Sequence, residues 1–373
     1  MDEKQIKTAI RSMRRIDLLD SPFVLTGLPW AAERGFYDRI PEDLMPAGAT
    51  DLFKEIATET SGGFARIRTN SPRVFFQGKL RRVKGTLYHM SRVGRSGFDF
   101  WIRREGEDRL SFQGTSVPFE YGTINTICEI AVKRNGLYDG RPEPEGIPGL
   151  YELRIVLPIY NVFDEACIYI EPDSEALPPE PQAYDKQVLF YGSSITQGAC
   201  ASRPSQCYTN RLALELDCPI LNFGFSGQCM AEPELADLIL KQKMDIFVYD
   251  YDHNAPDIPY LQKTHQPFFR RIREGRPDLP VIFTTKCDYN VSLDDNDERR
   301  RIIRATYEQA RQAGDENVYF VDGKDFFEGI RDCATVDGVH PNDLGFDRMA
   351  AAFRPLIRAL LDGDREAARR WQP

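Results

Sequence analysis

The sequence lacks the segments that would anchor or export a chain. No apolar stretch among its 373 residues approaches the ~20 residues that a membrane-spanning helix requires. The first five residues, MDEKQ, do not show the charged-then-apolar pattern of a secretory signal. We therefore expect a cytoplasmic protein with no membrane partner.

The sequence also lacks the common patterns for binding nucleotides and metals. The Gly/Ser-rich run at residues 192–198, GSSITQG, has neither the spacing of a P-loop nor that of a dinucleotide-binding glycine motif. The eight cysteines include no Cys-x-x-Cys pair, which favours reduced thiols over a disulfide framework or a zinc site. Cys200 and Cys207 are the one pair placed for a local bridge. We expect no metal and no organic cofactor.

Positive charge is not in excess. Lys and Arg total 48 against 57 Asp and Glu, giving a net charge of −9. A surface that attracts nucleic acid would need the opposite balance, so we expect no nucleic-acid partner. The length suggests about two domains at roughly 100–200 residues each.

Short alternating runs separated by turn residues characterise the first half of the chain. This pattern predicts an antiparallel β-sandwich with one buried face per strand. We also expect helices at residues 4–19 and 51–58. The strand-like runs lie at residues 66–68, 73–76, 98–102, 153–157 and 166–170.

A proline-rich stretch separates this half from a region of different pattern. Residues 171–181 hold four prolines and no apolar periodicity, so we place domains at 1–175 and 186–373 with a linker at 176–185. Apolar strands then alternate with amphipathic helices, which predicts a doubly wound parallel sheet. The expected strands are Val188–Tyr191, Ile220–Phe223, Ile246–Tyr249, Val281–Thr284 and Val318–Val321, and the expected helices cover 206–216, 232–242, 260–274, 298–312 and 344–361.

The run GSSITQG, residues 192–198, follows the first of these strands. Small residues on both sides of Ser194 permit a sharp strand-to-helix turn that exposes its hydroxyl, so Ser194 is the candidate nucleophile. The alternative is a connecting loop or a phosphate-binding helix start.

Histidine is scarce, with only four in the chain, and a serine nucleophile needs a base. His340 lies in the loop-like stretch DGVHPND, three residues after Asp337. One turn can thus supply both a base and the carboxylate that orients it. The alternative is that Asp337 closes a turn, Asp343 caps the next helix and His340 is an exposed loop residue.

Two further loops offer donors for an oxyanion. Gly227 follows the strand in NFGFSG and can present a backbone N–H, and Asn254 follows the next strand in DYDHN and can present a side-chain amide. Each is otherwise an ordinary turn or cap residue. A metal site at Asp250, Asp252 and His253 is disfavoured because alternate residues of a strand point to opposite faces.

These blocks resemble those of the SGNH (GDSL-type) hydrolases, whose name lists the serine, glycine, asparagine and histidine of the site. The resemblance covers roughly residues 186–362 and assigns those roles to Ser194, Gly227, Asn254 and His340, with Asp337 orienting the histidine. It implies a flavodoxin-like three-layer α/β/α domain with a five-stranded parallel sheet. The preceding domain is then a jelly-roll-like antiparallel β-sandwich.

The chain departs from the family pattern at two blocks. Ser193 stands where the family usually has Asp, and the block around Asn254 lacks the usual Gly-x-Asn-Asp. Asn254 is therefore the least secure of the assignments.

The resemblance implies a serine esterase. Some two-domain carbohydrate esterases have a similar arrangement, so we expect a short acyl ester, such as an acetyl ester, on a carbohydrate or small glycoside. Trp30 and Trp101 are candidates for stacking on a sugar. The alternatives are an acyltransferase with the same triad, a catalytically inert carbohydrate-binding protein and, with least support, a phosphoryl-transfer enzyme.

Overall fold

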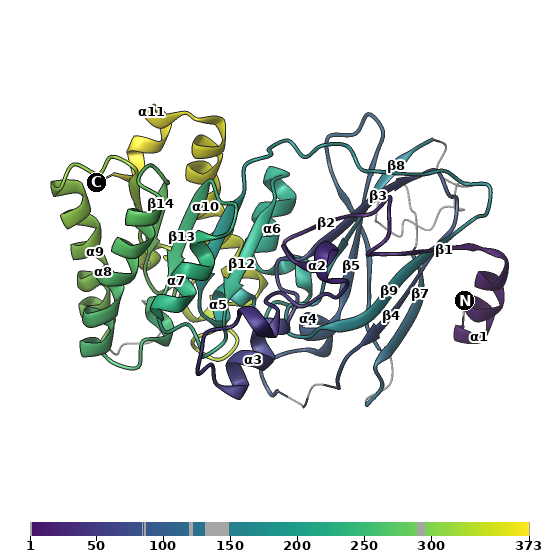
Figure 1. Ribbon diagram of the computed structural model, residues 1–373, viewed down its shortest axis with the longest axis horizontal. Coiled ribbons are helices and arrows are strands. Elements are labelled where there is room, and N and C mark those ends of the chain that lie inside the picture. The colour runs from purple at the N-terminus through teal and green to yellow at the C-terminus, as the bar shows by residue number, and fades with distance from the viewer. Residues whose placement is uncertain are drawn as a thin grey trace. The chain divides into compact units, whose positions relative to one another are not determined.

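The computed structural model describes residues 2–83, 85, 87–118, 122–130, 149–288 and 295–372 (Figure 1). The chain forms two compact units, each assembled from more than one segment. The first comprises Met1–Arg39, Thr58–Pro181 and Arg203–Ser205, and the second comprises Ile40–Ala57, Gln182–Ser202 and Gln206–Pro373. The sequence pattern does not predict that residues 40–57 belong to the second unit and residues 203–205 to the first.

Antiparallel strands build the first unit, as the alternating runs predict. One sheet has the order β1-β9-β4-β7 and the other the order β10-β3-β8-β5-β6, with β2 pairing on β3. Both sheets contribute to one apolar core, where the Phe76 ring of β4 lies 4.8 Å from Phe98 and 5.1 Å from Phe100 of β5. The predicted β-sandwich is confirmed. The strands are β1 Arg14–Asp17, β2 Val24–Thr26, β3 Phe64–Thr69, β4 Val74–Leu80, β5 Phe98–Arg104, β6 Ser111–Ser116, β7 Asn125–Ile130, β8 Tyr151–Val156, β9 Phe163–Ile170 and β10 Ala176–Leu177, and the helices are α1 Glu3–Ala9, α2 Ala31–Arg34 and α4 Arg92–Ser96.

The expected helix at residues 4–19 is wrong in its second half. Helix α1 ends at Ala9, and β1 follows and pairs antiparallel with β9. Ile16 is buried opposite Ile168 in this pairing. The sheet therefore outweighs the local helical pattern, because it buries an apolar side chain that a continued helix would leave without a partner.

A parallel sheet forms the centre of the second unit, with the strand order β12-β11-β13-β14-β15. The five predicted strands and their following helices are confirmed, with ends shifted by a few residues. Helices α7, α8 and α9 pack in sequence against one another, while α6 packs against α10. Right-handed crossovers place these two groups on opposite faces of the sheet, which gives three layers. The elements are β11 Val188–Gly192, α5 Ser194–Gln197, α6 Tyr208–Leu216, β12 Ile220–Gly224, α7 Pro233–Leu240, β13 Ile246–Asp250, α8 Ile258–Gly275, β14 Val281–Thr284, α9 Asn296–Gln312, β15 Val318–Val321, α10 Asp343–Asp362 and α11 Arg365–Ala368.

The register of three adjacent strands, β12, β11 and β13, brings their last residues level. Gly192 of β11 pairs with Gly224 of β12 on one side and with Asp250 of β13 on the other. This is the carboxyl edge, where open parallel sheets bind their ligands. The turns that carry Ser194, Gly227 and Asn254 all begin at this edge.

Residues 40–57 belong to the second unit although they precede most of the first. They contain most of helix α3, Asp51–Thr58, which matches the helix expected there. The Phe53 ring lies 5.0 Å from the Phe225 ring, and Thr50 Oγ1 donates to Gln228 Oε1 at 2.6 Å. Helix α3 thus packs on the loop after β12.

Residues 203–205 make the reverse exchange and belong to the first unit. The buried Asp99 carboxylate of β5 accepts the Ser205 backbone N–H at 2.8 Å and an Arg203 N–H at 3.0 Å. The Arg203 guanidinium also lies 3.7 Å from the centre of the Phe112 ring and 5.5 Å from that of Trp101.

All eight cysteines are free thiols, Cys200 and Cys207 included. Among the described residues, no helix combines the length and apolar character needed to cross a membrane.

Candidate active site

The candidate nucleophile lies at a tight turn between β11 and α5. Ser193 caps the helix, with its hydroxyl oxygen accepting the Ile195 N–H at 3.2 Å. A Cβ atom on Gly192 would lie 2.1 Å from Thr196 Oγ1 and 2.5 Å from the Asp250 carbonyl oxygen, so only glycine fits. The serine that replaces the usual family aspartate therefore serves as a helix cap, and the turn carries Ser194 at the first helical position.

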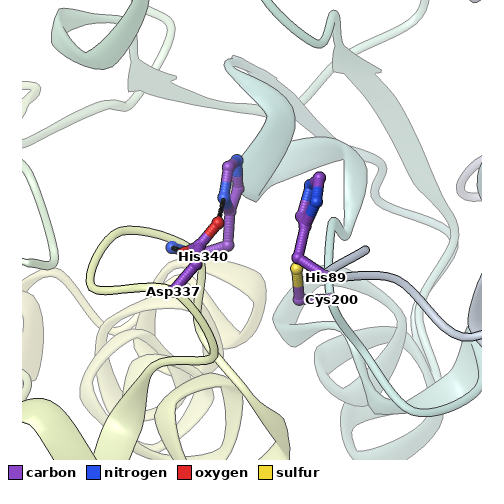
Figure 2. A group of neighbouring side chains, drawn as sticks. All are labelled: His89, Cys200, Asp337 and His340. Carbon is purple, nitrogen blue, oxygen red and sulfur yellow. Dashed lines mark hydrogen bonds and ion pairs between the residues drawn. The ribbon is translucent and has the colours of Figure 1, made fainter. Parts of the chain in front are cut away.

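Ser194, His340 and Asp337 lie within hydrogen-bond reach in a line. Ser194 Oγ is 3.0 Å from His340 Nε2, and His340 Nδ1 is 2.9 Å from Asp337 Oδ2. Figure 2 shows the Asp337 carboxylate turned toward the His340 ring. The His340 and Asp337 side chains are 20% and 13% exposed, so the pair is largely covered but reachable. This is the arrangement of nucleophile, base and orienting carboxylate that acyl transfer requires.

The electrostatics of Asp337 suit an orienting carboxylate. Its second oxygen, Oδ1, accepts the backbone N–H of His340 at 2.8 Å and that of Val339 at 3.1 Å. Burial alone would raise the pKa of Asp337, but the hydrogen bonds from His340 and Val339 outweigh it and hold that pKa below its ordinary value. Asp337 therefore stays ionised at neutral pH and keeps the proton of His340 on Nδ1.

The loop that carries both residues is closed by its own hydrogen bonds. Thr335 and Pro341 form an antiparallel bridge, and the Val336 N–H donates to the His340 carbonyl at 2.9 Å. Gly338 takes the left-handed conformation, with φ at +86°, inside this turn. Asn342, rather than Asp343, caps α10 through its side-chain oxygen. The loop thus holds the candidate base His340 in a closed turn.

Gly227 lies in a loop that is tied to the nucleophile turn. The Phe225 N–H donates to the Gly192 carbonyl at 2.9 Å, and the Ser226 N–H donates to Gln197 Oε1 at 3.0 Å. Gly227 itself is exposed and left-handed, with φ at +67°. These bonds bring the loop to the turn that carries Ser194.

Asn254 ends a short 3-10 turn, Asp252–Asn254, directly after β13. Arg299 fixes this turn by donating to the Asp252 carbonyl at 2.7 Å and to the Ala255 carbonyl at 3.0 Å. The Asn254 side-chain oxygen is buried and makes no hydrogen bond within the described part of the chain. The turn thus holds Asn254 at the carboxyl edge of the sheet.

The neighbouring His253 is paired with a residue that the sequence did not single out. Its Nε2 lies 3.1 Å from the buried Asp288 Oδ1, and the charge of Asp288 outweighs burial and raises the pKa of His253. With Cys287, these two residues form a group of metal-ligand type. Lys286 Nζ lies 3.8 Å from the other Asp288 oxygen, so the carboxylate already faces two cationic groups. The group is best described as an ion pair.

Cys200 lies beside Asp337 in the same unit (Figure 2). Burial, together with the negative charge of Asp337, raises the pKa of the Cys200 thiol to about 12. Because the thiolate is the form that attacks and binds metals, Cys200 does not compete with Ser194 as a nucleophile.

Comparison with known proteins supports the resemblance in both halves of the chain. Residues 185–358 match the GDSL-like lipase/acylhydrolase family. Residues 13–175 match the GxDLY family, described as the N-terminus of SGNH-type esterases. No curated protein shows significant similarity to the chain.

Solved structures with the same fold cover nearly the whole chain. A protein from Bacteroides ovatus described as a GDSL-like lipase is 26% identical, with a TM-score of 0.78 over 94% of this chain and 98% of that one. The salicylyl-acyltransferase SsfX3 of a tetracycline biosynthetic pathway is 18% identical, with a TM-score of 0.70 over the same shares. A family two carbohydrate esterase from Cellvibrio japonicus is 14% identical, with a TM-score of 0.55, again over 94% and 98%. Residues 185–358 thus form a region of the GDSL-like lipase/acylhydrolase family, preceded by a β-sandwich region that matches the N-terminus of SGNH-type esterases, and the protein is an ester hydrolase.

Proposed function

We propose that the protein is a serine esterase that removes a short acyl group, acetyl in the simplest case, from a carbohydrate or small glycoside. The Ser194 hydroxyl proton passes to His340 Nε2 as Oγ bonds to the ester carbonyl carbon. The carbonyl oxygen becomes an oxyanion, which N–H groups of Ser194 and Gly227 and the Asn254 amide stabilise. Collapse expels the alcohol, which takes the proton from His340, and water then releases the acid by the same steps.

One observation carries the proposal, which is the chain of contacts from Ser194 Oγ to His340 Nε2 and from His340 Nδ1 to Asp337. Both distances are about the length of a hydrogen bond, at 3.0 and 2.9 Å. The place of Asn254 on the turn that follows β13, at the carboxyl edge of the sheet, supports its assignment as an oxyanion donor.

The carbohydrate part of the proposal rests on the likeness in fold to family two carbohydrate esterases. Of the two tryptophans that we considered for sugar stacking, Trp101 lies beside Phe112 and the Arg203 guanidinium. Trp30 is half-buried at the start of α2. Both tryptophans are half-buried, so both stay candidates for sugar stacking.

The likeness in fold to salicylyl-acyltransferase SsfX3 favours a second candidate function, acyl transfer to an alcohol. It uses the same acyl-serine intermediate and differs only in the acceptor. Hydrolysis of a p-nitrophenyl ester in the presence of rising concentrations of a sugar alcohol separates the two. An esterase releases free acid throughout, whereas an acyltransferase accumulates the new ester.

The test of the nucleophile is intact-mass analysis after treatment with a fluorophosphonate, run beside hydrolysis of p-nitrophenyl acetate. We expect one adduct on the wild-type protein, and we expect Ser194→Ala to lose both the adduct and the hydrolysis. Ser202→Ala is a matched control, because Ser202 is an exposed serine of the same unit whose hydroxyl bonds to Asp343. No adduct on folded wild-type protein would contradict the proposal and favour an inert binding protein.

A further inference from the structure

Helix α5, which carries Ser194, is too short to hold itself in place. It has four residues, Ser194–Gln197, and a single helical turn is unstable without tertiary contacts. The position of the Ser194 hydroxyl relative to His340 must therefore be set by whatever packs against the turn.

The buried carboxylate of Asp250 bonds to a side chain of this turn and to a side chain of helix α6. The Thr196 hydroxyl donates to Asp250 Oδ2 at 2.9 Å, and the Tyr208 hydroxyl donates to the same oxygen at 3.1 Å. Thr196 and Tyr208 are fully buried, and Asp250 is 4% exposed. Burial raises the pKa of the Asp250 carboxyl, which shows that the group is held here at an electrostatic cost.

The sheet explains why Asp250 reaches the turn. Asp250 pairs with Gly192 at the ends of two adjacent strands, so its side chain starts level with the residue two before Ser194. On the other flank, Asn222 of β12 donates its side-chain N–H to the Thr196 carbonyl at 2.7 Å. The strands on both sides of β11 therefore both bond to Thr196, two positions after Ser194. Asp250 of β13 accepts from its hydroxyl, and Asn222 of β12 donates to its carbonyl.

We propose that Asp250 is a positioning residue for Ser194, acting through the Thr196 and Tyr208 hydroxyls. This inference rests on the proposed function, since it assigns Asp250 a role in holding the proposed nucleophile. Neither the spacing of the family blocks nor the strand pattern predicts it. It concerns a buried carboxylate that would act on Ser194 only through other side chains.

The test removes one hydroxyl at a time. Thr196→Val and Tyr208→Phe each delete a single donor to Asp250 with little change in shape. We expect kcat for p-nitrophenyl acetate to fall by roughly 10- to 100-fold in each, because a displacement of about 1 Å costs up to about 10²-fold. We expect KM to change by less than about threefold, and Thr196→Ser, which keeps the donor, to retain most of the activity.

Tyr249→Phe is the matched control. Tyr249 is another buried tyrosine of the second unit, and its hydroxyl donates to the His265 carbonyl at 3.2 Å without contacting the turn. We expect this variant to show how the loss of a buried tyrosine hydroxyl affects thermal stability, with kcat unchanged. If Tyr208→Phe and Thr196→Val keep wild-type kcat, or if Thr196→Ser loses as much as Thr196→Val, the positioning role is wrong.

Failure of the proposed function is distinguishable from failure of this inference. If Ser194→Ala keeps the wild-type rate, Ser194 is not the nucleophile and both ideas fall. If Ser194→Ala is inactive and the hydroxyl variants react with the fluorophosphonate as fast as wild type, only the role of Asp250 is refuted. Slower adduct formation at Ser194 in those variants supports both.

Discussion

We predict that His265 makes the stability of the second unit depend on pH. This residue of α8 is 1% exposed, and its ring stacks on Tyr249 with a centroid separation of 4.6 Å. Nδ1 lies 2.9 Å from the Thr306 hydroxyl, while Nε2 is buried without a partner among the described residues. A second proton would therefore sit on a buried nitrogen with nothing to receive its hydrogen bond.

Burial accordingly lowers the pKa of His265 to about 3. Between that value and the ordinary pKa of about 6.5, the unfolded chain binds a proton that the folded chain does not, so the folded state loses stability as pH falls. Each pH unit in this window costs about 1.4 kcal/mol, so lowering the pH from 7 to 5 removes about 2 kcal/mol from the free energy of unfolding.

The measurement compares wild type with His265→Asn, which keeps a polar group near Thr306 but cannot take up a proton. Urea unfolding is followed by far-UV circular dichroism, because the three longest helices, α8, α9 and α10, belong to the second unit. Subtracting one pH profile from the other removes the contributions of other titrating groups. Asp252 is one of these: burial raises its pKa to about 6, so it stabilises the folded state as pH falls, opposite to His265. Profiles that stay parallel to within about 0.5 kcal/mol from pH 7 to pH 5 would refute the reasoning.

Two predictions concern the catalytic groups. Asp337→Asn replaces an acceptor of the His340 Nδ1 proton with an amide that can favour the wrong tautomer, so we expect kcat to fall roughly 10⁴-fold with the fold intact; a wild-type kcat in this variant would remove Asp337 from the site. Asn254→Ala removes one proposed oxyanion donor, so we expect a loss of roughly 10²- to 10³-fold in kcat for p-nitrophenyl acetate. Full activity in Asn254→Ala would exclude Asn254 from that role.

The parts of the site that chemistry constrains most were the easiest to predict. A serine nucleophile needs small neighbours, a base and a carboxylate. Two of the four histidines, His253 and His340, have an aspartate three residues before them, and of these His340 lies in a loop-like stretch just before a helix. The structure brings Ser194, His340 and Asp337 together as that logic requires. Their roles, with those of Gly227 and Asn254, stay predictions until the variants are measured.

Contacts between distant parts of the chain leave no such local pattern. Asp250 reads in the sequence as one more polar residue at a strand end, and its bond to Thr196 depends on the register of two strands. The packing of Phe53 on Phe225 likewise joins a short N-terminal helix to a loop far along the chain. At residues 14–17, pairing with β9 decides between strand and helix, and the local pattern alone favoured helix.

Because residues 40–57 and 203–205 each belong to the other unit, the two halves of this chain cannot recombine independently. A recombination event at the proline-rich stretch near residue 180 would separate residues 40–57 from the unit that they complete, and residues 203–205 from theirs. Each half of the gene thus encodes a piece of the other half's product. A chimaera that exchanges one half between two relatives would therefore complete each unit with a segment from the other parent, so we expect the two units to evolve together.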